Sequence, residues 1–166
     1  MRLSFLWYHD EKGHFLWEVI KMYFVNREKI EEILSYMEKI QEELAEHSYK
    51  RFADQLLLER MTHLNIEAII DVGNMMIDGF IMRDPGSYED IIDILTDEKV
   101  LPEEEQEAYK QFVQLRKMIV QQYTEVDHEQ IAQVWQEQKH SLQAFPSRVR
   151  DYLDNELGPV SAFSKS

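Results

Sequence analysis

The stretch FADQLLLERMTHLNIEAIIDVGNMMIDGF, residues 52–80, contains the longest run of helical periodicity in this 166-residue chain. Its apolar side chains recur every three or four positions, a spacing that places them on one face of an α-helix. They are Phe52, Leu56, Met61, Leu64, Ala68, Val72, Met75, Met76 and Phe80. We therefore predict one long helix that begins near Lys50 or Arg51 and ends before Asp84-Pro85-Gly86, because proline does not continue a helix.

Four further segments show the same periodicity, and each begins with a residue that favours a helix N-terminus. These residues are Asn26, Ser87, Pro102 and Asp127. The first of these helices should end near His47, the second is short, and the fourth contains Pro146, which should kink or break it. No segment alternates apolar and polar residues with the period of a strand. The predicted fold is all-α: an up-and-down four-helix bundle with an extra short helix.

One helical domain is expected over residues 22–157, followed by a frayed tail over residues 158–166. Residues 1–21 show neither helical nor strand periodicity. Codons for Trp17-Glu18-Val19-Ile20 can spell a bacterial ribosome-binding site at a suitable distance before Met22. We therefore expect residues 1–21 to be a non-native or upstream extension. The alternative is a native N-terminal segment that packs on the bundle.

The composition excludes several classes of protein. The chain has no cysteine, so disulfides, thiolate nucleophiles and cysteine-based zinc sites are all excluded, and a reducing, cytoplasmic location is expected. No apolar run approaches the roughly 20 residues of a membrane-spanning helix. The net charge of −14 argues against non-specific coating of nucleic acid, because such binding requires many cations.

Any RNA would therefore bind locally, through a small group of cations that the fold brings together. The candidates in the central region are Arg60, Arg83, Lys110, Arg116 and Lys117. Arg116 and Tyr123 stand seven residues apart, so both should project from the same side of one helix. A guanidinium is always charged and its donors match two phosphate oxygens. The alternative is an arginine and a tyrosine at the rim of an ordinary bundle helix.

The segment Arg116-Lys117-Met118-Ile119-Val120-Gln121-Gln122-Tyr123 resembles the signature of the HepT-like ribonucleases (DUF86), a branch of the HEPN superfamily. That signature is Arg, Asn, two or three apolar residues, His, any residue and Tyr. The resemblance extends over about residues 22 to 155 and is closest to a bacterial subgroup of the family. The chain departs from the signature twice, with Lys117 in place of the asparagine and Gln121 in place of the catalytic histidine.

The resemblance implies an endoribonuclease toxin that pairs two motifs across a homodimer cleft and cleaves RNA without metal or cofactor. Arg116 would hold the scissile phosphate. Gln121 cannot transfer a proton at accessible pH, so cleavage should be weakened. Tyr123 would be a hydrogen-bond donor, and also the residue on which a nucleotidyltransferase antitoxin places adenylate groups. The alternative function is a catalytically inactive HEPN module that binds nucleotide or a protein partner.

Polar side chains recur along one side of the long helix: His63, Glu67, Asp71, Asn74 and Asp78. A solvated face is the ordinary explanation of such a pattern, and a metal site is another. A third is that Glu67 or Asp71 turns inward and orients Arg116. Lys117 is a further candidate for contact with RNA. No metal is assigned to the site.

Overall fold

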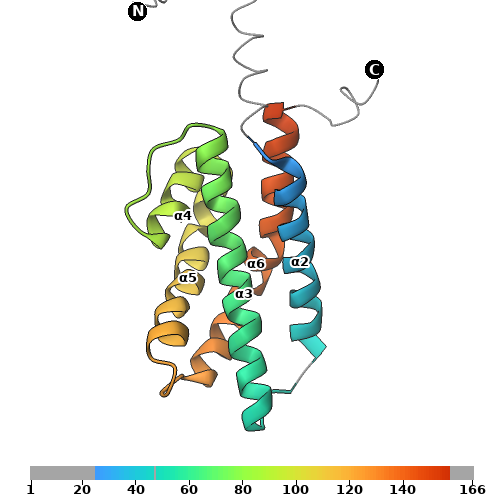
Figure 1. The fold of residues 1–166 in the computed structure, drawn as a ribbon, viewed down its shortest axis with the longest axis vertical. Helices are drawn as coiled ribbons and strands as arrows, with labels where there is room; N and C mark the ends of the chain where they lie inside the picture. The colour runs from blue at the N-terminus through green and yellow to red at the C-terminus, as the bar shows by residue number, and fades with distance from the viewer. Residues whose placement is uncertain (1–24, 47, 158–166) are drawn as a thin grey trace, which may run out of the picture.

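The computed structural model describes residues 25–46 and 48–157, which form five α-helices, a 3₁₀ turn and no strand (Figure 1). The elements are α2 (Arg27–Glu46), α3 (Phe52–Gly79), α4 (Tyr88–Asp97), η1 (Glu103–Glu105), α5 (Gln106–Gln121) and α6 (His128–Leu157). This confirms the predicted all-α class. The predicted extension over residues 1–21 and the tail over residues 158–166 lie outside the described residues.

Four long helices run up and down along a common axis, and short α4 lies beside α3 and α5 (Figure 1). The predicted bundle with one extra short helix is therefore confirmed. Its interior contains Met37 from α2, Ile69 from α3, Phe112 from α5 and Phe145 from α6, all fully buried. The apolar face predicted for the long helix is right only in part, since Ala68, Val72, Met76 and Phe80 are buried but Phe52 and Leu56 are exposed. No helix of the described residues is long and apolar enough to cross a membrane.

Side-chain caps fix the starts of three helices. Asn26, Ser87 and Asp127 each accept the backbone N–H three residues later, at 3.0, 3.1 and 2.9 Å. Each cap satisfies a backbone donor that has no partner within the helix. Pro102 precedes the 3₁₀ turn that leads into α5. The starts predicted at Asn26, Ser87 and Asp127 are thus confirmed by individual hydrogen bonds, whereas α5 begins at Gln106, after the 3₁₀ turn.

Helix α3 ends at Gly79, before Asp84-Pro85-Gly86 as predicted, but the proline does not end it, because the helix stops several residues earlier. Ile81 takes a left-handed backbone conformation with φ of 54°. Its N–H donates to the Asp78 carbonyl at 3.3 Å, and the N–H of Met82 donates to the Ile77 carbonyl at 2.9 Å. This pair of bonds is a Schellman motif, which closes a helix without proline.

Replacing Ile81 by glycine should stabilise the protein. A β-branched residue is strained at positive φ, whereas glycine adopts it freely. Ile81 is 65% exposed, so little packing is lost. We expect the free energy of unfolding to rise by roughly 0.5–1 kcal/mol in urea denaturation. Ile81→Ala is the matched control, since it removes the side chain but keeps the Cβ. An equal gain in both variants would contradict the strain explanation.

Pro146 does not break the last helix, since α6 continues through it to Leu157. Proline lacks an N–H, so the carbonyl four residues earlier, that of Leu142, loses its helical donor. Gln41 from α2 replaces that donor, with its Nε2 3.1 Å from the Leu142 carbonyl oxygen. The same Nε2 lies 3.1 Å from Oδ1 of Asn65 on α3. A buried amide network therefore compensates the proline and joins three helices.

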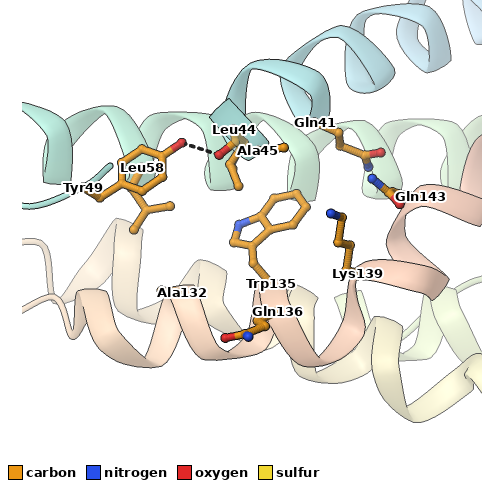
Figure 2. Close-up of a pocket in the computed structure, with 10 residues that line it drawn as sticks. All are labelled: Gln41, Leu44, Ala45, Tyr49, Leu58, Ala132, Trp135, Gln136, Lys139 and Gln143. Carbon is orange, nitrogen blue, oxygen red and sulfur yellow. Dashed lines mark hydrogen bonds between the residues drawn. The ribbon is translucent and has the colours of Figure 1, made fainter. Parts of the chain in front are cut away.

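Gln41 also lines an open groove of about 380 Å³ between α2, the start of α3 and α6 (Figure 2). Trp135 lies at its centre, and Tyr49 donates its hydroxyl to the Leu44 carbonyl at 2.9 Å. The lining residues are Gln41, Leu44, Ala45, Tyr49, Leu58, Ala132, Trp135, Gln136, Lys139 and Gln143. None of them belongs to α4 or α5, so this groove is separate from the surroundings of Arg116.

Candidate functional site

Arg116 is held at a junction of three helices. Its Nε donates to Oε1 of Glu67 on α3 at 2.6 Å, and its guanidinium carbon lies 4.7 Å from the centre of the Tyr88 ring at the start of α4. The hydrogen bond that Arg116 donates to Glu67 raises the pKa of Arg116 above its ordinary value. The side chain is 24% exposed. Arg116 is thus a fixed cation rather than a mobile surface arginine, because both a carboxylate and an aromatic face position it.

An open groove of about 440 Å³ borders this cation. Its lining comes from the first turn of α4 and the second half of α5: Tyr88, Glu89, Val113, Gln114, Arg116, Lys117 and Gln121. The groove therefore combines an aromatic ring, two cations, two amides and the carboxylate of Glu89. The ring can stack on a base, and the cations and amides can hydrogen-bond to phosphate oxygens.

Gln121 is the last residue of α5 and lies on the groove with Arg116. Tyr123 does not share that position. The prediction that Arg116 and Tyr123 project from one side of a single helix is wrong, because α5 ends at Gln121 and Gln122 already leaves helical geometry with ψ of 35°. Tyr123 lies in the connection to α6, is 72% exposed, and is absent from the lining of the groove.

We predicted that Glu67 or Asp71 of the long helix turns inward toward Arg116, and Glu67 makes this contact. Asp71 is exposed and makes no ion pair with another described residue. Lys117 is exposed and lines the groove.

Sequence reasoning did not connect His63 with Arg116. Its Nε2 lies 3.4 Å from the same Oε1 of Glu67 that binds Arg116. The only signal in the sequence was the four-residue spacing between His63 and Glu67.

Three of the five candidate cations are each paired with a carboxylate. Arg83 donates to both oxygens of Asp90, at 2.6 and 2.8 Å, and Lys110 lies 2.5 Å from Asp93. The Arg83 guanidinium lowers the pKa of Asp90 to about 2. Arg116, the third, is paired with Glu67. Because carboxylates neutralise three of the five cations, a single copy of the chain does not present all five as one basic surface. Within the described part of the chain, no three His, Cys, Asp or Glu side chains are placed to hold a metal ion.

Large apolar side chains are exposed where α3 begins and α5 ends, at the same end of the bundle (Figure 1). They are Phe52 (73% exposed), Leu56 (47%), Leu57 (38%), Val120 (40%) and Tyr123 (72%). Single exposed apolar residues are common, but a group of them at one end is typical of a surface that contacts a partner.

The architecture has the fold of a HEPN toxin. It matches a solved structure described as a tri-AMPylated Shewanella oneidensis HEPN toxin in complex with an MNT antitoxin. The TM-score is 0.63 at 20% identity, over 74% of this chain and 95% of that one.

A sequence model described as "Ribonuclease HepT-like" matches residues 28–149. The chain is also 49% identical to the Bacillus subtilis (strain 168) protein named "Putative RNase YutE", over 86% of this chain and 99% of that protein. The solved structure of YutE, described as a cytosolic protein of unknown function, matches at a TM-score of 0.81 and 48% identity, over 84% and 99% of the two chains. The chain therefore belongs to the HepT-like ribonuclease family, as its sequence predicted.

Proposed function

We propose that this protein is a cytoplasmic, metal-independent endoribonuclease whose active form is a homodimer. The observation that carries the proposal is the groove in which Arg116, fixed by Glu67, lies beside Lys117 and Gln121. Arg116 would bind the scissile phosphate and stabilise the charge that develops as the phosphorus is attacked. Lys117 would contact a neighbouring phosphate. Asp71, exposed on α3, is the remaining candidate for contact with RNA or for orienting these groups.

Two features support the homodimer. The exposed apolar residues Phe52, Leu56, Val120 and Tyr123 lie at the end of the bundle that carries the motif. A symmetric interface there would bury them and bring two Arg116 grooves together. Pairing would also bring two sets of cations together, which a strongly acidic chain needs if it is to bind RNA.

The partner we propose is a nucleotidyltransferase-type antitoxin, and its target on this chain is Tyr123. An exposed phenol in a helix connection is open to a modifying enzyme. Adenylate groups on it would place bulky negative charge at the motif end of the bundle, where RNA would otherwise enter. In support, a protein with the same fold is described in AMPylated form and in complex with an MNT antitoxin.

A second function is favoured by one observation. Gln121 occupies the motif position of the proton-transferring histidine, and an amide neither accepts nor releases a proton at accessible pH. A chain with that replacement can keep the groove and the dimer and bind nucleotide or a protein partner without cleaving RNA. The two functions differ in whether the purified protein cuts RNA at all.

A cleavage assay on mixed-sequence single-stranded RNA, with chelator present, tests the proposal. We expect slow cleavage by the wild type and a rate at least tenfold lower for Arg116→Ala, since the loss of a charge-stabilising donor is costly. Arg83→Ala is the matched control, because Arg83 is an ion-paired arginine that does not line the groove. Light scattering should show a dimer at micromolar concentration. Equal cleavage by wild type and Arg116→Ala would refute the ribonuclease assignment, and a strict monomer would refute the composite cleft.

A further inference from the structure

We propose that His63 supplies the acid–base group that the motif lacks at Gln121. This inference rests on the proposed ribonuclease function and adds a catalytic residue to it. The observation is a shared carboxylate: Oε1 of Glu67 lies 2.6 Å from Nε of Arg116 and 3.4 Å from Nε2 of His63. One carboxylate on α3 therefore connects the proposed phosphate ligand with an imidazole.

His63 does not line the groove beside Arg116, but the register of the two helices places it near the level of Gln121. Helices α3 and α5 run in opposite directions in the bundle (Figure 1), and the Glu67–Arg116 contact joins them at one level. His63 lies about 6 Å from that level toward the start of α3, since a helix rises about 1.5 Å per residue. Gln121 lies about 7.5 Å from it toward the end of α5. Both displacements point to the same end of the bundle.

The surroundings of His63 suit proton transfer. Its side chain is 26% exposed, so the imidazole is held by its neighbours yet open to solvent on one side. A carboxylate beside an imidazole orients the ring, as in catalytic His–carboxylate pairs. The charged groups that face it are Glu67 on its own helix and, through Glu67, Arg116 on α5. With Nε2 turned to Glu67, Nδ1 is the nitrogen left to exchange a proton.

The other described histidines do not share this arrangement. His128, at the start of α6, lies 2.6 Å from Oε1 of Glu59, a different carboxylate. His140, further along α6, is exposed and makes no ion pair with a described residue. Among residues 25–46 and 48–157, His63 is thus the histidine connected to Arg116. His128 offers a matched control, because it too is a half-buried histidine paired with a glutamate of α3.

The reaction balances without metal. The ribose 2′-oxygen bonds to phosphorus as its proton passes to Nδ1 of His63, and the bond from phosphorus to the 5′-oxygen breaks. The leaving 5′-oxygen takes a proton from water, and the imidazolium returns its proton to solvent. The products are a 2′,3′-cyclic phosphate and a 5′-hydroxyl. Arg116 stabilises the charge on the phosphoryl oxygens throughout.

The test is a set of RNA cleavage rates across pH 5 to 9 for wild type, His63→Gln, His128→Gln and Arg116→Ala. We expect His63→Gln to lower the rate at least tenfold, as for loss of a placed general base, and to remove the rise in rate through the imidazole pKa. RNA binding should be unchanged, and His128→Gln should behave as wild type. For His63→Ala, added imidazole should restore part of the rate, which a purely structural role would not allow.

The outcomes separate the two proposals. If Arg116→Ala loses cleavage while His63→Gln keeps both the rate and the pH profile, His63 is not the acid–base group and the ribonuclease assignment stands. If the wild type cleaves no faster than Arg116→Ala, the ribonuclease assignment fails and the role of His63 fails with it. A loss of rate in His63→Gln that also appears in His128→Gln, without rescue of His63→Ala by imidazole, would likewise overturn the proposal.

Discussion

Replacing Gln121 by histidine should raise the rate of RNA cleavage by an order of magnitude or more. Gln121 lines the groove that contains Arg116, so an imidazole there would lie on the surface where the phosphate is proposed to bind. A placed general base contributes roughly 10²- to 10⁴-fold. The pH profile of the variant should keep a step near neutrality, where imidazole titrates, even when His63 is also replaced by glutamine. Chelator should leave the gain intact, and adding Arg116→Ala should remove it.

The same substitution also tests the role of His63. If His63 already supplies a base, Gln121→His should raise the rate more in a His63→Gln background than in the wild type, because two groups that perform one task are not additive. The measurement is the full set of four single-turnover rates at saturating protein. Equal gains in both backgrounds would show that the two positions act independently. A variant that folds and dimerises yet stays inert would favour the binding-module function.

The helices could be predicted because their signals are local. The caps at Asn26, Ser87 and Asp127 lie within one turn of the N–H groups they satisfy, and the apolar periodicity extends over whole helices. The end of α3 could not be predicted in the same way. It depends on Ile81 at positive φ, a conformation for which isoleucine is among the least suited residues, so the sequence pointed to Pro85 instead.

The site could be predicted only in part, for a related reason. Helical spacing along α3 put Glu67 on a face with other polar residues, and this was enough to propose that it orients Arg116. The contact of Arg116 with Tyr88 depends on how the loop after α3 returns α4 to the side of α5, which no local pattern specifies. The position of Tyr123 depends on where α5 ends. The helix ends two residues before Tyr123, so this residue lies in the exposed connection and not on the same side of α5 as Arg116.

Replacing Gln41 by methionine should destabilise the fold by about 2–6 kcal/mol, since two buried acceptors lose a donor at roughly 1–3 kcal/mol each. Gln41 is 7% exposed, and its Nε2 serves both the Leu142 carbonyl and Oδ1 of Asn65. Methionine keeps the length and volume of the side chain but donates nothing. Urea denaturation should therefore show a lower midpoint with an unchanged slope.

Pro146→Ala separates the two contributions to the loss of stability in Gln41→Met, that of the Leu142 carbonyl and that of Asn65. Alanine restores an N–H that can bond to the Leu142 carbonyl within α6, so Gln41 is then needed only by Asn65. In the Pro146→Ala background, Gln41→Met should destabilise the fold by about half as much as in the wild type, on the order of 1–3 kcal/mol. The double-mutant cycle measures this coupling directly. If Gln41→Met costs the same with proline and with alanine at residue 146, Gln41 does not compensate the proline, and α6 passes residue 146 by another means.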